Sequence, residues 1–410
     1  MKLMELLGRI RKVETKTAGW AAAWLRDDAG IEQLAMIDAY RQSSWVYAAV
    51  SARATKLAQV PFKLTIGVRQ GEMAVNSGPL FELFQQPHPQ LDKFAFWELI
   101  STWLDLRGEA FLVGLDAGGR VVNFRERGRE RPSRLLVLNP DNFQHVIENH
   151  ALVGWRYSDG NNSPMAAAML LPEEVIHIKL PNPVDFWRGA SPLSVAMLAV
   201  QTDYNAGQFM KGLMLNNADA GILVTVKERL SPSQIEQIRS MLAERKRRAG
   251  AADRPLLLPC DAKIEKPALS AADLQFLENR KFLRQEICAI FRVPQTVLGF
   301  TEDANRAVDQ SQWIGWIHHV IAPLCGRLEA AFQPVIRLFA GRQPVYGWFD
   351  IEDLPEMVAA RRGRMDAAEK LFAMGVPLND INRTLDLGLP VYPWGNQGYV
   401  PAQMQRISQD

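Results

Sequence analysis

The feature that most constrains this chain is one long stretch of helix-forming residues. The stretch begins at Ser191-Pro192, a helix-capping residue followed by proline at the first helical position, and it contains no further proline up to Asn217. A helix from Pro192 to Asn217 would span about 39 Å, because each helical residue adds about 1.5 Å. This is long for a helix in a globular core.

A second long helix is expected from Ser270 to the residues before Pro294. Its apolar residues form two stripes, one beginning with Leu274 and Leu277 and the other made by Phe276, Leu283, Ile287 and Ile290. Two apolar faces on one helix predict neighbours on two sides. Between the stripes lies a basic strip of Arg280, Lys281 and Arg284, which is either a solvated face or a wall that faces a polyanion.

Composition excludes several classes of protein. The length of 410 residues predicts two or three compact modules. The 47 Lys and Arg against 45 Asp and Glu give a net charge of +2, which excludes a polybasic protein that binds by neutralising phosphates. Cys260, Cys288 and Cys325 have no metal-binding spacing, and we expect reduced, buried side chains in a cytoplasmic setting.

Neither a membrane span nor an export signal is expected. No apolar run approaches the roughly 18 residues of a spanning helix. The N-terminal residues interleave charges with Leu and Ile and lack a cleavage site for a signal peptidase. Their amphipathic pattern favours a helix that docks on protein over a membrane anchor.

Residues up to about 190 predict an α+β module. Residues 43–64 form a helix that Pro61 stops before an alternating strand, and residues 94–106 form a helix that Gly108 ends before the next strand. Short strands are expected at RLLVL, FQHVIE, VGWRY and EVIHIKL, with a hairpin turn from Asp116 to Gly119. The arginine-rich stretch from Arg120 to Arg134 predicts a solvated loop or a contact with an acidic partner.

Between the two long helices, a further helix start is expected at Ser231, which forms a capping box with Gln234. That helix ends in a basic cluster before Gly250, made of Arg245, Lys246, Arg247 and Arg248. The cluster is either an exposed helix end or a surface for a partner.

The region after the second long helix begins with a polar stretch, Phe300 to Gln310, for which we expect a mobile loop. Helical spacing resumes at Trp313, and Pro323 and Pro334 should each kink or break that helix. The last 60 residues predict a helix from Met357 to Met374, a short helix from Asn379 and an irregular tail.

The sequence contains no motif of a known catalytic, nucleotide-binding or metal-binding site. The chain has no phosphate-binding loop, dinucleotide fingerprint, zinc-protease motif or nucleophile elbow. His318 and His319 are adjacent and point about 100° apart on a helix, so one should be packed and the other exposed, without a shared metal. Four aspartates are expected to cap helices and start turns: Asp92, Asp105, Asp116 and Asp141. Four tryptophans are expected in the core or at subunit contacts: Trp97, Trp103, Trp313 and Trp316. No catalytic residue, metal or cofactor is therefore expected.

Eight segments occur in an order typical of one family: 43–64, 80–89, 97–113, 134–144, 174–196, 230–239, 273–299 and 375–390. They include LFELFQQPHP and DLQFLENRKFLRQEICAIFRVPQTVLG. In this order they resemble the portal proteins of tailed bacteriophages, in the branch associated with HK97-like and gene-transfer-agent heads. Residues 1–40, 125–134 and 391–410 take no part in the resemblance.

The resemblance implies an α+β portal-protein fold with a wing, a two-helix stem, a small α/β clip and a mostly helical crown. By position, the wing comprises residues 1–197 and 300–348, and the stem helices 198–218 and 274–299. The clip comprises residues 219–273 and the crown residues 349–410.

The resemblance also implies a homo-oligomeric ring, usually of twelve subunits, at the portal vertex of the capsid in a virion assembled in the bacterial cytoplasm. The large terminase pumps double-stranded DNA through such a ring, the major capsid protein surrounds it, and head-completion or adaptor proteins attach to it. No membrane takes part. The Arg245–Arg248 cluster would lie on the clip, where the terminase or an adaptor could dock.

By the same resemblance, residues 301–310 would be the tunnel loop at the narrowest point of the channel. Its DNA-facing residues would be Thr301, Glu302, Asp303, Ala304, Asn305 and Arg306. Nearby carboxylates offset the charge of Arg306, and a contact with phosphates reads no sequence. Without the resemblance, the stretch would be interpreted as an ordinary surface loop.

Two other functions stay open from the residues alone. One is a nucleic-acid-processing enzyme with an unrecognised carboxylate metal site, which metal-dependent cleavage would reveal. The other is an adaptor or scaffold of the head that forms no channel, which images of the purified chain would reveal. A channel should hold its cargo weakly, and the near-zero net charge fits that requirement.

Overall fold

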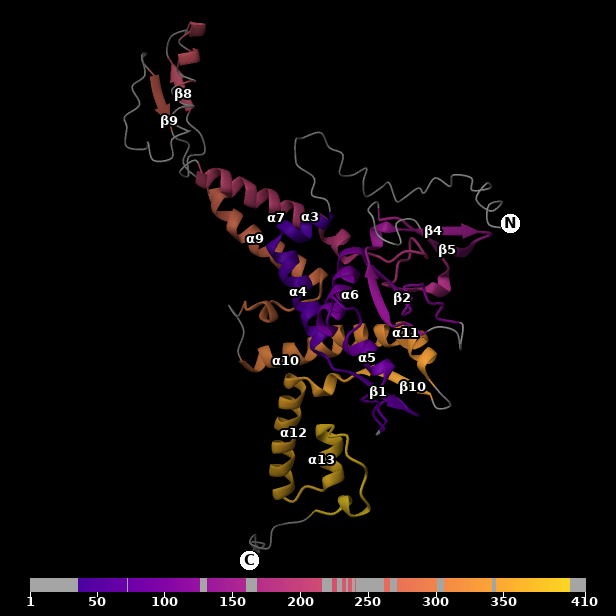
Figure 1. Ribbon diagram of the computed structural model, residues 1–410. Helices are drawn as coiled ribbons and strands as arrows, with labels where there is room; N and C mark the ends of the chain where they lie inside the picture. Colours follow the sequence, from indigo (N-terminus) through magenta and orange to yellow (C-terminus); the bar gives the residue numbers. More distant parts are fainter. Residues whose placement is uncertain are drawn as a thin grey trace, which may run out of the picture. The chain divides into compact units, whose positions relative to one another are not determined.

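The structure is a computed structural model of the chain (Figure 1). It describes residues 36–71, 73–125, 131–159, 168–215, 223–226, 231–233, 235–237, 240, 262–265, 271–300, 306–340 and 344–398. The chain divides into two compact units, unit 1 with residues 1–42 and 201–280, and unit 2 with residues 43–200 and 281–410. Helices α7 (Pro192–Leu215) and α9 (Ala271–Ile290) each begin in one unit and end in the other.

Unit 2 begins with helix α4 (Ser44–Gln59), as the sequence predicts. The Ser43 hydroxyl accepts a hydrogen bond from the Val46 backbone N–H at 3.4 Å, and Pro61 stands just beyond the helix end. Strand β1 (Phe62–Ile66) follows and pairs antiparallel with β10 (Val345–Phe349). This pairing joins the two sequence segments of unit 2.

Along the chain, helix α6 (Lys93–Arg107) follows a short helix, α5 (Pro79–Gln85), and precedes the first three-stranded sheet. The Asp92 carboxylate caps its start by accepting from the Ala95 N–H at 2.8 Å. Gly108 ends it with φ of +75°, and a Cβ there would lie 2.3 Å from the Ala190 backbone. Both the left-handed backbone and the close approach require glycine.

Two antiparallel sheets of three strands follow. In the first, β2 (Glu109–Leu115) lies between β3 (Arg134–Leu138) and β7 (Val175–Lys179). The second has the order β4 (Phe143–Glu148), β5 (Ala151–Tyr157) and β6 (Ala168–Leu170). Short 3₁₀ turns, η1 (Pro140–Asn142) and η2 (Pro172–Glu174), connect the sheets. The predicted strands and the Asp116–Gly119 turn are confirmed, whereas β6 was not predicted.

The sheets share an apolar cluster. The Phe111 ring of β2 stacks on the Phe143 ring of β4, with ring centroids 4.1 Å apart, and the Trp155 ring lies edge-on to Phe111. All three side chains are fully buried. The cluster therefore fixes the two sheets against each other.

A second aromatic cluster joins the helices of unit 2 to the β1–β10 pair. It consists of Phe62, Phe84, Phe96, Trp97, Phe332 and Phe349. The Phe332 ring, which is fully buried, lies 5.1 Å from the Trp97 ring and 5.8 Å from the Phe84 ring between centroids. The expected core position of Trp97 is thus confirmed.

The C-terminal half of unit 2 is helical. A 3₁₀ turn, η4 (Gln295–Leu298), precedes α10 (Arg306–Trp316), a π-helical segment η5 (Ile317–Ile321) and α11 (Ala322–Phe339). After β10 come η6 (Ile351–Asp353), α12 (Pro355–Ala373), α13 (Leu378–Leu385) and η7 (Pro393–Asn396). The two terminal helices that the sequence predicts are therefore present.

In this half, the structure corrects the expectation for the two histidines and shows that the two prolines do not interrupt the helix. Neither Pro323 nor Pro334 breaks the helix, which runs without a non-helical residue from Arg306 to Phe339. Pro323 follows the π-helical segment, where the hydrogen-bond register is already irregular, and fully buried residues on both sides hold Pro334 in α11. His318 and His319 are both exposed, because Ile317 and Ile321 fill the buried side of this turn.

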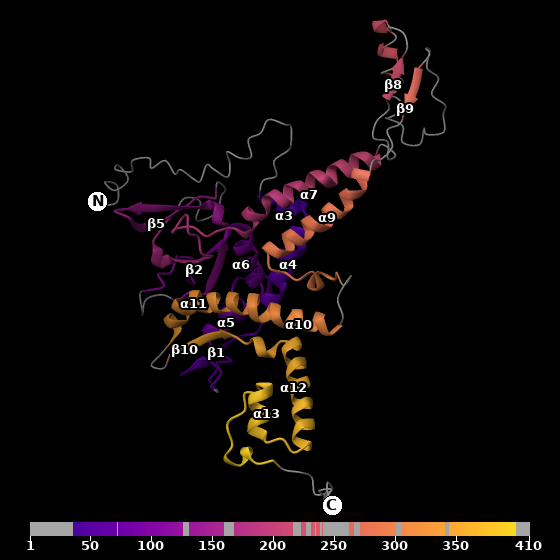
Figure 2. The same ribbon diagram turned by 180° about the vertical axis from the view of Figure 1, so that it is seen from behind.

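Unit 1 contains α3 (Met36–Gln42), the second part of α7, a two-stranded antiparallel sheet and the first part of α9. The sheet pairs β8 (Leu223–Val226) with β9 (Ala262–Glu265). Figures 1 and 2 show α7 and α9 side by side. Within this unit, Arg280 of α9 forms an ion pair with Asp203 of α7, with 2.8 Å between Nε and Oδ1.

Candidate functional site

The expected DNA-facing segment is only partly described. Thr301, Glu302, Asp303, Ala304 and Asn305 lie outside the described residues, whereas Arg306 is the first residue of α10. The expected loop to Gln310 is therefore wrong for residues 306–310, which are helical. The stretch lacks large apolar residues, but Arg, Ala and Gln favour helix, and the segment continues into Trp313 and Trp316.

On the N-terminal side of this segment, three side chains pack together. The Arg284 guanidinium carbon of α9 lies 3.9 Å from the Phe300 ring centroid and 5.6 Å from the Trp45 ring centroid. The Trp45 and Phe300 rings meet edge-to-face, with 5.6 Å between centroids. Arg284 is buried and donates from Nη2 to the Gln295 amide oxygen at 3.2 Å. Among the described residues no carboxylate pairs with Arg284, so aromatic faces surround its charge.

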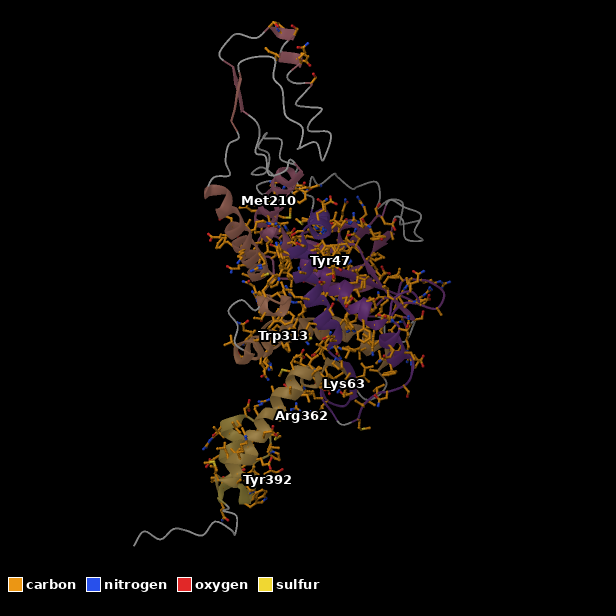
Figure 3. All side chains as sticks on the ribbon, turned by 90° about the vertical axis from the view of Figure 1, so that its left-hand side faces the viewer. Tyr47, Lys63, Met210, Trp313, Arg362 and Tyr392 are labelled. Atoms are coloured by element: carbon orange, nitrogen blue, oxygen red, sulfur yellow. The ribbon has the colours of Figure 1, made fainter. Side chains whose placement is uncertain are left out.

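On the C-terminal side of the segment 301–305, a lysine makes a cation–π contact with a tryptophan of α10. The Lys56 ammonium of α4 lies 5.4 Å from the Trp313 ring centroid on α10, and Figure 3 labels Trp313. Lys56 also donates to the Glu356 carboxylate of α12 at 2.6 Å and to the Gln59 amide oxygen at 3.3 Å. Because Lys56 is buried, these contacts compensate its desolvation.

The basic strip does not form one exposed surface. Arg284 is buried, Lys281 is exposed, and Arg280 is partly buried in its ion pair with Asp203. The Asp203 hydrogen bond raises the pKa of Arg280. Sequence spacing brings the three residues together on α9 but does not reveal that Arg284 packs inward.

The clip cluster Arg245, Lys246, Arg247 and Arg248 lies outside the described residues, as do Gln234 and Cys260. At the expected helix start, Pro232 and Ser233 are helical, and the Ile235 N–H donates to the Ser231 carbonyl at 3.1 Å.

Cys288 and Cys325 are free and buried, as predicted, and burial raises the pKa of both thiols. Burial therefore disfavours the reactive thiolate form of both side chains.

A buried ion pair connects α4 and α6 to the end of α9. Arg53 Nη1 lies 2.9 Å from Asp105 Oδ1 and donates to the Phe291 carbonyl at 3.1 Å. Burial raises the pKa of Asp105 to about 6, and the charge of Arg53 opposes this rise. Asp105 lies in the last turn of α6, at a helix end as expected, but it does not serve as a cap, because its side chain faces a buried arginine 52 positions earlier in the chain.

A second buried carboxylate holds the loop before α7. Glu109 accepts from Arg188 Nε at 2.6 Å and from the Gly189 N–H at 3.1 Å, and lies 2.9 Å from His177 Nε2. Burial lowers the pKa of His177, which stacks on the Phe111 ring. The loop is thus held firmly to the first sheet.

This loop and the helices beside it expose large apolar side chains that the sequence did not single out. In unit 2, Val184, Phe186, Val195 and Phe282 are 66–76% exposed. Where such side chains form a contiguous patch, they are typical of sites that contact other proteins. No signal in the sequence separates them from buried residues of the same type.

The described residues contain no group of His, Cys, Asp and Glu that could hold a metal ion. No helix among them is both long and apolar enough to cross a bilayer. The contacts described above place buried charges at a few helix junctions.

Comparisons with known proteins agree with this picture. The probable portal protein of Streptomyces phage phiC31 is 25% identical over 277 residues, which are 66% of this chain and 57% of that protein. A chain in the neck of a native gene transfer agent (GTA) particle, computed with C12 symmetry, has a similar fold, with a TM-score of 0.59 and 21% identity over 87% of this chain and 93% of that one. An HK97-family phage portal protein from Corynebacterium diphtheriae has a TM-score of 0.53 and 16% identity over 78% and 96%.

The family model described as phage portal protein matches residues 44–380. These residues include the four sheets described above, both long helices and α12. The chain therefore belongs to the phage portal protein family.

Proposed function

We propose that twelve copies of this chain close into a ring at one capsid vertex and that double-stranded DNA enters and leaves the particle through the ring. The observation that carries the proposal is the family match over residues 44–380, together with a fold similar to a chain in a neck of C12 symmetry. The family and its fold are structural and not enzymatic. The ring would be part of the virion, after assembly in the bacterial cytoplasm.

Exposed apolar residues support assembly with further copies. A closed ring uses two different surfaces on each subunit, because each copy contacts its neighbours head to tail. Unit 2 carries exposed apolar residues on the loop before α7, on α7 and on α9, and neighbouring copies would cover them in such a ring. In such a ring, α7 and α9 would form the stem, the residues between them the clip, and the residues after 349 the crown.

The charge balance supports conduction without a firm grip on DNA. A net charge of +2 on each copy keeps the number of phosphate contacts small, and their salt-dependent binding would otherwise multiply over twelve copies. The segment 301–306 would contact phosphates without reading sequence. The large terminase, the major capsid protein and head-completion proteins would be the protein partners.

Ring formation is the first test. The purified full chain should give particles of about twelve times the monomer mass, and rotationally averaged images should show a hollow axis. Native mass spectrometry and electron microscopy measure both. Monomers at all protein and salt concentrations would contradict the proposal.

The clip cluster provides a second prediction. Reversing the charges of Arg245, Lys246, Arg247 and Arg248 to Glu should leave ring mass unchanged and should weaken terminase binding by at least about tenfold, because several charge-assisted contacts would become repulsive. Binding of labelled terminase to immobilised rings measures this effect. Reversal of the exposed Arg361 and Arg362 on α12 is the control. Equal terminase binding by both variants would mean that the cluster is only a solvated helix end.

A further inference from the structure

We propose that the loop before α7, residues 181–189, is a pre-organised anchor whose Val184 and Phe186 side chains insert into the neighbouring copy of this chain. The inference rests on the proposed function, since the ring supplies the neighbouring copy. It assigns two residues to the contact between copies and further residues to holding them in position. All of them lie in unit 2.

The two anchor side chains are almost fully in water in the single chain. Phe186 is 76% exposed and Val184 is 73% exposed. Covering a large apolar side chain is among the most favourable contributions to association, and a few such residues usually provide most of the binding energy of an interface.

The loop holds these side chains on a rigid backbone. The Asn182 amide oxygen accepts from the Val184 N–H at 3.0 Å and from the Asp185 N–H at 3.2 Å. One carboxylate oxygen of Asp185 accepts from the Trp187 N–H at 2.8 Å and from the Arg188 N–H at 3.3 Å. Two side-chain-capped turns therefore follow each other, and the loop has little conformational freedom left to lose when a partner binds.

The base of the loop is fixed to both three-stranded sheets. In addition to its ion pair with the buried carboxylate of β2, Arg188 donates from Nη1 to the Phe143 carbonyl at 2.7 Å and from Nη2 to the Pro140 carbonyl at 3.2 Å. The Lys179 ammonium of β7 donates to the Phe186 carbonyl and lies 4.7 Å from the centroid of the Phe186 ring. The position of this ring is thereby set before a partner arrives.

The surface of this part of the chain carries no charge. Between positions 181 and 200 the exposed residues are Pro181, Pro183, Val184, Phe186, Ser194, Val195 and Leu198. The two charged residues of the stretch, Asp185 and Arg188, are partly buried and make the contacts described above. Depletion of charge is typical of the core of an interface, above all between permanently associated copies.

This chemistry favours a second copy of the chain over other occupants. A surface without an exposed cation has nothing with which to neutralise phosphates, so DNA is not its partner. Proteins that bind and leave use surfaces about as polar as the rest of the molecule, whereas this one is uncharged. A closed ring places the loop of every copy beside a different surface of the next copy, and that contact is permanent.

Assembly of the full chain tests the anchor. Phe186→Ser should raise the protein concentration at which half of the chains are in rings by at least about tenfold, and Val184→Ser by about threefold, because each exposes less apolar area to the neighbour. Val391→Ser is the matched control, since Val391 is 77% exposed and lies outside this loop, and it should stay within about twofold of the parent. Native mass spectrometry over a range of concentrations measures the effect. Equal unfolding midpoints of the unassembled chains show that folding is not its cause.

The positioning role of Asp185 has its own test. Asp185→Ala removes the acceptor for two backbone N–H groups but keeps Phe186, and it should weaken assembly by about threefold. Asp185→Asn keeps an acceptor oxygen and should assemble like the parent. Hydrogen exchange of residues 182–190 in the unassembled chain should be faster in the alanine variant alone. Faster exchange with unchanged assembly would overturn the role of pre-organisation.

A crosslink identifies the occupant. With p-benzoylphenylalanine in place of Phe186, irradiation of the purified oligomer should give a product with the mass of two copies. Mixing isotope-labelled and unlabelled chains should show that the crosslinked peptide comes from another copy. Crosslinks only to other proteins of assembled particles would overturn the choice of occupant.

The outcomes separate the anchor from the proposed function. Parent rings with a hollow axis, together with Phe186→Ser rings that form at the parent concentration, would overturn the anchor and leave the ring. Copy-to-copy crosslinks from position 186 in an oligomer without a hollow axis would support the anchor and contradict the ring.

Discussion

Replacing Phe332 with alanine is expected to lower the free energy of unfolding by about 3–5 kcal/mol. Phe332 is fully buried, and its ring packs against Phe84, Phe96 and Trp97 from α5 and α6. Truncation removes apolar contact area and leaves a cavity that surrounding rings cannot fill without leaving their own contacts. Because Phe332 lies on α11, the loss would loosen the helix against the β1–β10 pair.

Denaturant unfolding of the unassembled chain, followed by tryptophan fluorescence, measures this effect. Val184→Ala is the control, since Val184 is exposed in the single chain and its truncation should change stability by less than about 0.5 kcal/mol. A loss below about 1 kcal/mol for Phe332→Ala would mean that the aromatic cluster is less tightly packed than the structure shows.

Replacing Asp105 with alanine is expected to cost about 3–5 kcal/mol at pH 7.5, because it leaves the buried Arg53 guanidinium without its countercharge. The double variant Arg53→Met with Asp105→Leu removes both charges and should recover much of this loss. Recovery should be incomplete, since the Phe291 carbonyl also loses its hydrogen-bond donor. A double variant as unstable as Asp105→Ala would show that the volume of the site, and not the unpaired charge, determines stability.

The ion pair of Arg53 and Asp105 should also make the stability of the chain depend on pH. The pKa of Asp105 is raised from 3.8 to about 6, so the folded chain binds its proton more tightly than the unfolded chain does. Stability from this group is complete below about pH 4 and is lost as the pH rises through about 6. The parent chain should therefore lose stability over this interval, and the double variant should lose less. Unfolding curves at pH 4.5, 5.5, 6.5 and 7.5 measure the difference, and parallel pH profiles would contradict it.

Much of the secondary structure could be predicted because its signals are local. Asp92 and Gly108 mark the ends of α6 by a side-chain cap and a left-handed residue, and Pro61 marks the passage from α4 to β1. In the strands of the first sheet, apolar residues alternate with polar ones or form short runs, and turn residues lie on either side. Signals of this kind act over three or four positions, and the sequence displays them directly.

Long-range contacts could not be predicted in the same way. Nothing near Phe62 indicates that its strand pairs with residues 345–349, and nothing near Asp105 indicates Arg53. The burial of Arg284 depends on Trp45, which is distant in sequence. The start of α10 at Arg306 is not predicted, because a stretch with few apolar residues favours a loop. The helix propensity of its residues and the tryptophans that follow nevertheless indicate a helix.

The candidate site followed from the order of segments and not from a motif. The assignment of residues 301–306 and 245–248 depends on a resemblance that covers most of the chain, and the described part of the structure adds the contacts on either side of the first segment. No local pattern reveals that Lys56 contacts Trp313 or that Trp45 contacts Phe300.

The pairing of β1 with β10 has a consequence for biosynthesis. Lys63 and its partner Asp350 are separated by 287 positions, so a nascent chain leaves the ribosome with β1 unpaired until most of unit 2 has been made. At elongation rates of about 5–20 residues per second this interval is about 15–60 s. During it, the aromatic side of β1 and helix α6 are exposed in a crowded cell, and a chaperone that shields this edge would raise the yield of assembly-competent subunits.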